Sequence, residues 1–345
     1  MNAPVKIETT LKDWVTDQEV RWCPGCGDYA ILKAVQRTLP QLGADPANTC
    51  FISGIGCSSR FPYYMESYGF HTIHGRAPAI ATGVKLANPD LDIWLVTGDG
   101  DGLSIGGNHL MHVLRRNVNM QIMLFNNEIY GLTKGQYSPT SREGTKSPST
   151  PIGSYDHPAK PAAFALGAGA RFVARGFDVS KKLPEVLVAA HAHQGAAFIE
   201  IFQNCIVYNK DVFEDFAAPK GAEDRQLWLE DGQPMLFAGA AKGLTLNRDT
   251  LALEVVDVVD GDHEAAGVLV HDVTSRTIAH MLVEMPFGPF PMALGVLYDD
   301  PMPTFETAVV EERARASEGK DDNLAKLLAK GQTWTVDANE GHPTD

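Results

Sequence analysis

The chain has 345 residues, of which 44% are hydrophobic, and its formal net charge is −14. This length and composition allow a large buried core, formed by one big domain or by two smaller ones. The acidic balance argues against binding to a nucleic-acid backbone. The charged N-terminus and the lack of a bilayer-length apolar run argue against a signal peptide or a membrane span, so we expect a cytoplasmic protein without a membrane partner.

Helical and strand-like patterns alternate from about residue 27 to residue 202. The expected helices carry an apolar face, and Asp28 is expected to cap the first of them. These helices cover about 28–39, 78–88, 108–116, 162–166 and 183–193. The expected strands are short apolar runs at 49–53, from Ile93, at 120–125, around Phe172 and at 198–202. The alternation predicts an α/β fold with a doubly wound, mostly parallel sheet.

The pattern weakens after Cys205, where only short elements can be assigned. We expect strands at 267–270 and 293–298 and helices at 274–285 and 324–328. The expected organisation is an N-terminal arm (1–20), a main domain (21–215), a C-terminal lobe or packing arm (216–335) and a disordered tail (336–345). Within the main domain, residues 130–161 are rich in Ser, Thr, Pro, Gly and Lys, which is typical of a functional loop or a partner-binding segment.

Polar side chains follow two expected strands at the point where each strand ends. Gly98-Asp99-Gly100-Asp101 ends the strand from Ile93, and Asn126-Asn127 ends the next. Because ligands bind at the carboxyl ends of strands in open α/β sheets, Asp99, Asn127 and the Ile129 carbonyl are candidate ligands of Mg²⁺ that holds a diphosphate. The alternative is an ordinary tight turn, while the G-x-G-x-x-G pattern of dinucleotide binding does not follow a strand here.

Four of the five cysteines have a spacing that suits a metal site. Cys23-Pro24-Gly25-Cys26 is a C-x-x-C loop, and Cys57 and Cys205 each follow an expected strand. In a parallel sheet Cys57 and Cys205 would emerge at the same edge as Asp99 and Asn127, where four thiolates could hold a [4Fe–4S] cluster or a structural zinc. A redox-active C-x-x-C pair is a further reading, and Cys50 is expected to be a buried apolar residue.

Two basic or titratable residues complete the candidate site. His74 lies just before the helix at 78–88, where it could donate a hydrogen bond to a phosphate. Arg60 follows Cys57 by three residues and could form a forked contact with a substrate carboxylate. The competing readings are a structural histidine and an ordinary surface arginine.

Together, several ordered motifs resemble the β subunit of a 2-oxoacid:ferredoxin oxidoreductase, the subunit that carries thiamine diphosphate and an iron–sulfur cluster. The resemblance extends from about residue 15 to 215. The sequence of residues 148–160 and the long C-terminal extension look most like those of the bacterial 2-oxoglutarate enzymes. The motifs are Trp22-Cys23-Pro24-Gly25-Cys26-Gly27, Gly54-Ile55-Gly56-Cys57-Ser58, His71-Thr72-Ile73-His74-Gly75-Arg76, Gly98-Asp99-Gly100 with Asn126-Asn127, and the run from Asn127 to Gln136.

The resemblance implies roles for these positions in a thiamine diphosphate-binding fold. Asp99, Asn127 and the Ile129 carbonyl would bind Mg²⁺, Arg60 would meet the substrate carboxylate, and Cys23, Cys26, Cys57 and Cys205 would ligate one [4Fe–4S] cluster. Thiamine diphosphate would contact Ile55, Gly56, Cys57, Ser58, His74, Gly100, Asp101, Gly131 and Leu132.

The implied activity is oxidative decarboxylation of a 2-oxoacid, with coenzyme A as acyl acceptor and ferredoxin as electron acceptor. An α subunit would supply the activating glutamate and part of the substrate site in an α2β2 complex. Pyruvate is the alternative substrate. A non-oxidative thiamine diphosphate decarboxylase or synthase, or a non-enzymatic protein with a structural zinc, are the alternative functions.

Overall fold

The computed structural model describes residues 7–218, 221–319, 323–332 and 334. The expected tail at 336–345 and the first six residues of the expected N-terminal arm lie outside the described residues. The chain divides after Glu306 into two compact units, of which the first holds every candidate site residue. No helix in the described ranges is long and apolar enough to cross a membrane.

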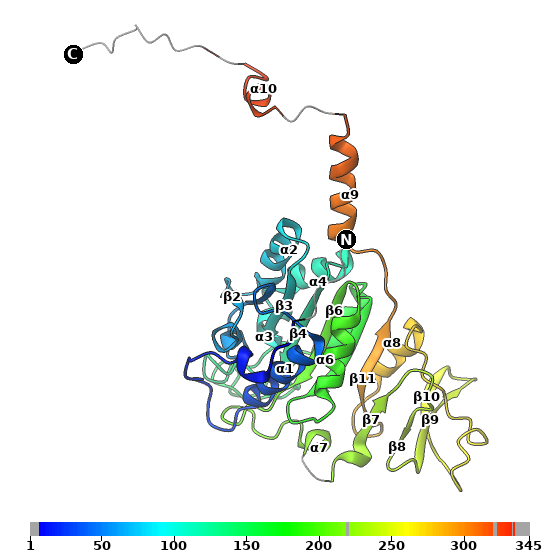
Figure 1. Cartoon of the computed structure of the whole chain (residues 1–345). Coiled ribbons are helices and arrows are strands. Elements are labelled where there is room, and N and C mark those ends of the chain that lie inside the picture. The colour runs from blue at the N-terminus through cyan, green and yellow to red at the C-terminus, as the bar shows by residue number, and fades with distance from the viewer. Residues whose placement is uncertain (1–6, 219–220, 320–322, 333, 335–345) are drawn as a thin grey trace. The chain divides into compact units, whose positions relative to one another are not determined.

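A mostly parallel sheet, with eight strands in the described part of the chain, organises the first unit (Figure 1). Its strand order is β2-β1-β3-β4-β6-β5-β11-β7; β11 pairs antiparallel with β5, and β7 pairs parallel with β11. The strands of this sheet are β1 (Thr49–Ser53), β2 (Tyr68–His71), β3 (Asp92–Gly98), β4 (Met120–Asn126), β5 (Phe172–Phe177), β6 (Ala196–Phe202), β7 (Gln226–Leu229) and β11 (Met292–Asp299). The predicted doubly wound, mostly parallel α/β sheet is confirmed.

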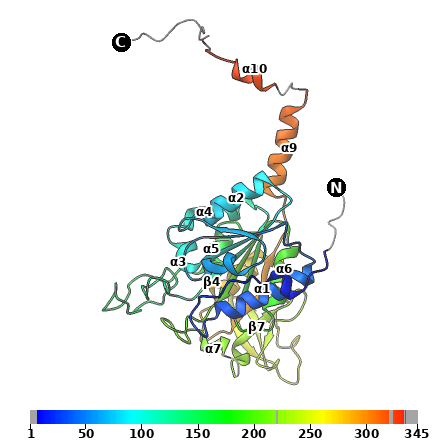
Figure 2. The ribbon, with the colours of Figure 1, turned by 60° about the vertical axis from the view of Figure 1, so that its left-hand side comes forward.

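Helices cover both faces of this sheet. Helices α1 and α6 lie against each other on one face, and α2, α4, α5 and α8 pack on the other, as the turned view in Figure 2 shows for α1, α6, α4 and α5. The helices of the described residues are η1 (Leu11–Trp14), α1 (Asp28–Leu42), η2 (Ser58–Tyr64), α2 (Ala77–Ala87), α3 (Asp99–Leu103), α4 (Gly107–Arg116), α5 (Pro161–Gly167), α6 (Leu183–Ala192), α7 (Glu214–Ala217), η3 (Glu223–Arg225), α8 (Arg276–Glu284), α9 (Phe305–Ser317) and α10 (Leu324–Leu328).

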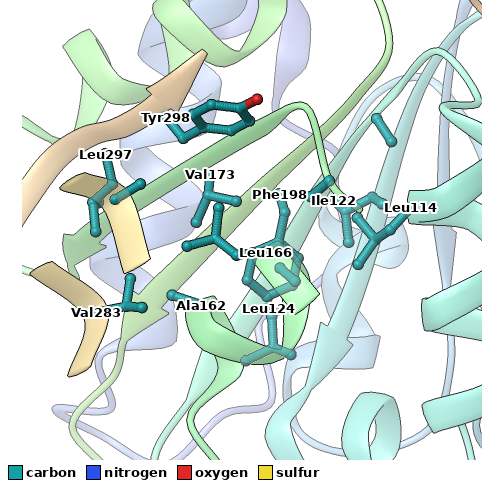
Figure 3. Packing of buried hydrophobic residues seen from close by; sticks show 14 of the residues in the cluster. Leu114, Ile122, Leu124, Ala162, Leu166, Val173, Phe198, Val283, Leu297 and Tyr298 are labelled. Atoms are coloured by element: carbon teal, nitrogen blue, oxygen red, sulfur yellow. The ribbon is translucent and has the colours of Figure 1, made fainter. Parts of the chain in front are cut away.

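The strands are apolar on both sides because each side faces a helix layer. In β4, Ile122 and Leu124 belong to the core beneath α4 and α5, whereas Met123 and Phe125 belong to the core beneath α1 and α6. Figure 3 shows Ile122 and Leu124 with Phe198 of β6 against Leu166 of α5. This double burial holds the strands rigid and fixes the positions of the loops that leave their carboxyl ends.

Two of the local predictions are wrong. Residues 267–270 form no strand: Gly267 has φ +67°, and of the four only Val270 forms a β-bridge, an isolated one with Pro234. Asp28 does not cap α1, because Gly27 occupies the N-cap position and the Asp28 side chain is buried. Sequence reasoning also missed β2, β7 and a small antiparallel sheet of β8 (Leu236–Phe237), β9 (Lys242–Asn247) and β10 (Ala252–Asp257).

The expected boundary at residue 215 divides the chain within the first compact unit. Strands β7 and β11 lie beyond this boundary, yet both pair in the main sheet. The division into a main domain and a C-terminal lobe remains a proposal about how the chain is organised.

Candidate functional site

The candidate residues gather at one edge of the sheet. Strands β2, β1, β3, β4 and β6 run parallel, so their carboxyl ends lie at this edge. His74 follows β2, Cys57 follows β1, Asp99 follows β3, Asn127 follows β4, and Cys205 follows β6. The arrangement is the one in which open α/β sheets bind their ligands.

A cavity of about 80 Å³ opens beside Asp99, and we call it the Asp99 cavity. Every residue predicted to contact the diphosphate cofactor or its cation lines this cavity. These residues are Ile55, Gly56, Cys57, Ser58, His74, Asp99, Gly100, Asp101, Asn127, Ile129, Gly131 and Leu132. The structure therefore brings the predicted set together, while the role of each residue stays a prediction.

Asp99 is held by hydroxyl groups that the sequence reasoning did not single out. Its Oδ2 atom accepts hydrogen bonds from Ser138 Oγ and Thr140 Oγ1, both at 2.6 Å. Both bonds fall on Oδ2, so Oδ1 is the oxygen without a hydroxyl donor. Burial raises the pKa of Asp99, and the two hydroxyls oppose that shift. The Ser/Thr-rich composition of residues 130–161 was the available signal, but it does not say which hydroxyls return to Asp99.

The hydrogen bonds continue from Thr140 to the far side of the sheet edge. Thr140 Oγ1, which donates its one proton most closely to Asp99, also lies 3.0 Å from Asn126 Oδ1, which can share that proton. Asn126 Nδ2 in turn donates to Glu200 Oε1 at 2.9 Å. Glu200 Oε2 pairs with Arg175 Nε at 2.8 Å, and both of these side chains are buried. Because each side chain is hydrogen-bonded to the next, the network from Arg175 to Thr140 forms a fixed support for the Asp99 carboxylate.

Asp101 was predicted to contact the cofactor, and the structure shows both of its oxygens bonded to the protein. Oδ1 accepts the backbone N–H groups of Ile55 at 3.1 Å and Gly75 at 2.7 Å, and Oδ2 accepts the Thr97 hydroxyl at 2.7 Å. His74 Nδ1 also lies 2.7 Å from Oδ1, in ion-pair range but without the alignment of a hydrogen bond. Asp101 thus holds two segments to the end of β3: the loop after β1 that contains Ile55, which we call the Ile55 loop, and the turn after β2 that contains His74.

The four predicted cysteines surround a second cavity of about 210 Å³, which we call the cysteine cavity. Its lining includes Cys23, Cys26, Cys57, Cys205 and Arg60. Burial raises the pKa of the Cys57 thiol to about 12 and also raises that of Cys26. Thiols in such a setting ionise when a metal centre accepts their sulfur. Four sulfur donors around one cavity fit the expected iron–sulfur cluster.

The remaining metal-site observations concern Cys50 and smaller ligand groups. Cys50 is buried in β1 as part of the hydrophobic core, which confirms its prediction as an apolar residue. Among the described residues, no three or more His, Cys, Asp or Glu side chains converge on one point as the ligands of a single metal ion would. The four cysteines line the cysteine cavity without converging on one point, and in a [4Fe–4S] cluster each thiolate binds its own iron.

The two cavities are adjacent and share part of their walls. Their common lining is formed by Cys57, Asn127, Gly131, Leu132 and Gln203. A group bound among the cysteines would therefore lie next to a ligand bound at Asp99, which is the arrangement that short-range electron transfer requires.

Asp28 is a further residue of the site that the sequence analysis did not identify. Its side chain lines the Asp99 cavity and is only 1% exposed. Within the described part of the chain, neither of its oxygens has a well-aligned hydrogen-bond partner, although Cys26 lies close enough to interact. Burial raises the pKa of Asp28 to about 7. Its position two residues after the C-x-x-C loop was the available signal, but Asp28 was interpreted as a helix cap and so was not considered as part of the site.

Comparison with known families identifies the fold that carries these positions. The family described as "Thiamine pyrophosphate enzyme, C-terminal TPP binding domain" matches residues 54–201. The matched segment extends from the loop after β1 to the end of β6 and so includes Asp99, Asn127 and the Ile55 loop. The expected thiamine diphosphate-binding fold is confirmed.

Individual relatives match over longer stretches. The 2-oxoglutarate oxidoreductase subunit KorB of Mycobacterium tuberculosis is 50% identical over 94% of this chain and 88% of its own length. The β subunit of 2-oxoacid:ferredoxin oxidoreductase 1 from Aeropyrum pernix is 46% identical over 61% of this chain and 65% of its own length. A solved structure of 2-oxoglutarate:ferredoxin oxidoreductase from Magnetococcus marinus, with 2-oxoglutarate, coenzyme A and succinyl-CoA bound, superposes with a TM-score of 0.75 at 36% identity. That match covers 96% of this chain and 100% of the other.

Proposed function

Because the chain belongs to the family of 2-oxoacid:ferredoxin oxidoreductase β subunits, we propose that it oxidatively decarboxylates 2-oxoglutarate to an acyl-CoA and CO₂. Coenzyme A accepts the acyl group and ferredoxin accepts the electrons. The active enzyme is an α2β2 complex of this chain with an α subunit, and it works in the cytoplasm. Its reaction is reversible in principle.

The shared wall between the Asp99 cavity and the cysteine cavity is the observation that carries this proposal. When bound, thiamine diphosphate supplies the electron sink for decarboxylation, and a [4Fe–4S] cluster accepts electrons one at a time. In this assignment Asp99, Asn127 and the Ile129 carbonyl bind Mg²⁺, and Cys23, Cys26, Cys57 and Cys205 bind the cluster. A non-oxidative thiamine enzyme would not need the second cavity.

The chain's own residues orient the substrate and hold the cofactor's diphosphate end. Arg60 lines the cysteine cavity close to the shared wall, where its guanidinium can pair with the carboxylate of a 2-oxoacid. The glycines of the Ile55 loop and of the turn after β3 leave backbone N–H groups accessible to phosphate oxygens. His74, lying beside Asp101, adds a hydrogen-bond donor to the same cavity.

The size of the Asp99 cavity supports dependence on a partner chain. Pockets that enclose whole small ligands measure about 300–1,000 Å³, and this cavity measures about 80 Å³. It suits the metal–diphosphate end of the cofactor, so the ring end needs walls from elsewhere. We assign these walls, and the glutamate that activates the aminopyrimidine ring, to the α subunit.

The proposal is tested by anaerobic co-purification with the α subunit. Iron and acid-labile sulfide are measured first, and dye reduction is then compared with 2-oxoglutarate and with pyruvate, each with coenzyme A. We expect about four irons per chain and faster turnover of 2-oxoglutarate. Faster turnover of pyruvate would contradict the assignment of 2-oxoglutarate as substrate. An active enzyme without iron would contradict the oxidoreductase mechanism.

Two cysteine variants give a matched comparison within this experiment. Cys57→Ser removes a thiol from the cysteine cavity, whereas Cys50→Ser changes a cysteine of the hydrophobic core. Only Cys57→Ser should lower the iron content of the folded complex. Asp99→Ala should abolish binding of thiamine diphosphate and leave the iron in place; a non-enzymatic zinc protein would show no cofactor binding before or after that change.

A further inference from the structure

Gln203 is a buried side chain that lies between the two cavities. It follows β6 directly, its backbone N–H donates to the Asn126 carbonyl at 2.8 Å, and it is 1% exposed. The same side chain lines both the Asp99 cavity and the cysteine cavity. A polar group in this position contacts whatever occupies either side.

Each end of the Gln203 amide is committed to a candidate metal ligand. Its Oε1 atom accepts a hydrogen bond from Asn127 Nδ2 at 2.8 Å. Its Nε2 atom donates to Cys26 Sγ at 3.2 Å and to the Asn204 carbonyl at 2.7 Å. The amide orientation is fixed by its neighbours, because only the nitrogen can donate to the Asn204 carbonyl and only the oxygen can accept from Asn127.

The bond to Asn127 selects the atom that the asparagine offers to a cation. A cation is bound by oxygen and not by the amide nitrogen. Gln203 accepts from Asn127 Nδ2, and the Ile129 backbone N–H donates to Asn127 Oδ1 at 3.2 Å, so the Asn127 amide is held from both ends with Oδ1 as the only atom that can bind a cation. Loss of the bond to Gln203 would leave the amide held by the longer Ile129 contact alone, and the coordinating oxygen would be less well preorganised.

The bond to Cys26 acts on the other side. An N–H donor to a cysteine sulfur withdraws electron density from the metal–sulfur unit and stabilises its reduced, more negative state. Such a donor therefore raises the reduction potential of a cluster held by that sulfur. Gln203 is buried, so water cannot replace the lost donor easily.

We propose that Gln203 is a positioning residue that couples the cation site to the cluster, an inference that rests on the proposed function. Through Asn127 it orients the oxygen that binds Mg²⁺, and through Cys26 it raises the reduction potential of the [4Fe–4S] cluster. One amide thus sets both the placement of the diphosphate and the driving force for removal of electrons beside it.

The test uses Gln203→Met in the complete complex, because methionine has a similar length and shape without strong hydrogen-bonding groups. The matched control is Gln121→Met, a buried glutamine of β4 that pairs with Ala197, at the other end of β6 from Gln203. Three quantities are measured anaerobically: iron content, the cluster midpoint potential by redox titration followed by electron paramagnetic resonance, and the Mg²⁺ dependence of thiamine diphosphate binding without substrate.

We expect Gln203→Met to keep its iron, to shift the midpoint potential to a more negative value, and to weaken Mg²⁺ binding about 10- to 100-fold, as lost outer-shell contacts do. Gln121→Met should change none of the three quantities. An unchanged potential and unchanged Mg²⁺ affinity with the cluster intact would overturn the inference while leaving the proposed function standing. A wild-type complex without iron would instead overturn the proposed function.

A second variant covers failure of cluster assembly in Gln203→Met. Gln203→Asn keeps the amide but is one methylene shorter, so it cannot reach Asn127 and Cys26 together. It should make the midpoint potential more negative, weaken Mg²⁺ binding, or do both. If neither variant assembles a cluster while Gln121→Met does, Gln203 is required for assembly and the tuning role is wrong.

Discussion

The Oδ1 atom of Asp101 accepts the backbone N–H of Gly75 at 2.7 Å, which ties the end of β3 to the turn that carries His74. The same oxygen accepts the N–H of Ile55 at 3.1 Å. A side chain added at the neighbouring Gly54 would place its Cβ 1.8 Å from Asp101 Oδ2, so a glycine is needed for this approach. Two loops that line the Asp99 cavity therefore depend on one buried carboxylate.

Asp101→Asn should loosen both loops. The asparagine oxygen can replace Oδ1, but it is neutral, so the bonds from Ile55 and Gly75 lose the charge that strengthens them. The amide nitrogen then replaces Oδ2, where the Thr97 hydroxyl can no longer donate and has to turn to accept. The expected cost is about 1–3 kcal/mol in the free energy of unfolding, together with weaker thiamine diphosphate binding. Thermal unfolding and cofactor titration measure the two effects. Asp90→Asn, at an exposed turn, is the control, and equal behaviour of the two variants would contradict the role given to Asp101.

The placement of Asp99 and Asn127 could be predicted because both follow apolar runs that end abruptly. A parallel sheet brings such ends to one edge whatever the details of the loops. The supporting residues were not predictable in this way. Ser138 and Thr140 reach Asp99 only through the path of a long loop, and Gln203 and Asp28 gain their importance from burial that no local pattern shows.

The elements after residue 205 were predicted less well for a related reason. Strands β8 to β10 are short, and much of their surface is half-buried or exposed, so their periodicity is weak. At 267–270 the apolar residues suggested a strand, but their backbone groups bond to two separate segments: Leu269 N–H donates to the Leu244 carbonyl, and its own carbonyl accepts from Met235. Apolar character without alternation did not distinguish these cases.

Thr140→Val should weaken Mg²⁺ binding. Valine has the same shape as threonine but removes the donor to Asp99 Oδ2 and breaks the link to Asn126. By analogy with other outer-shell changes we expect a loss of about 10-fold or more in Mg²⁺ affinity, measured from the cation dependence of thiamine diphosphate binding. Thr140→Ser should restore most of the affinity because it keeps the hydroxyl. Thr145→Val, whose hydroxyl bonds to the Arg142 carbonyl in the same loop, should have no effect.

Gly131→Ala should affect the cluster without affecting the fold. The added Cβ would lie 3.4 Å from Cys205 Sγ and 3.7 Å from Cys57 Sγ, which are ordinary contacts in the protein alone. It would nevertheless occupy space between these thiols that a bound cluster needs. We expect a lower iron content and faster loss of iron in air, measured by iron analysis, with an unchanged thermal midpoint for the iron-free chain. Gly83→Ala in α2, where a Cβ meets no atom within 4 Å, is the control; a full iron complement in Gly131→Ala would contradict the assignment of the cavity.

Arg60→Ala should raise the KM for 2-oxoglutarate. A hydrogen bond to a charged group contributes about 1.5–3 kcal/mol, so the expected increase is roughly 10- to 150-fold at low salt. Arg60→Lys keeps the charge but loses the forked geometry, so its KM should lie between those of the wild type and Arg60→Ala. Steady-state kinetics of the complex measure this, with the exposed Arg37 changed to Ala as control. An unchanged KM would remove Arg60 from the substrate site.

Asp28→Asn should change how stability depends on pH. Burial raises the pKa of Asp28 from 3.8 to about 7, so between these values the folded chain binds this proton more tightly than the unfolded chain does. The free energy of unfolding therefore falls as pH rises from about 4 towards 7, by an amount on the order of 4 kcal/mol at most. Asparagine has no charge to bury, so the variant should gain thermal stability relative to wild type as pH rises. Glu128, whose pKa is also raised to about 7 by burial, contributes the same trend to both chains and cancels in the difference. Thermal midpoints of the iron-free chains at pH 5 and pH 8 measure the effect, and a difference that is equal at both values would show that Asp28 is not a buried titrating group.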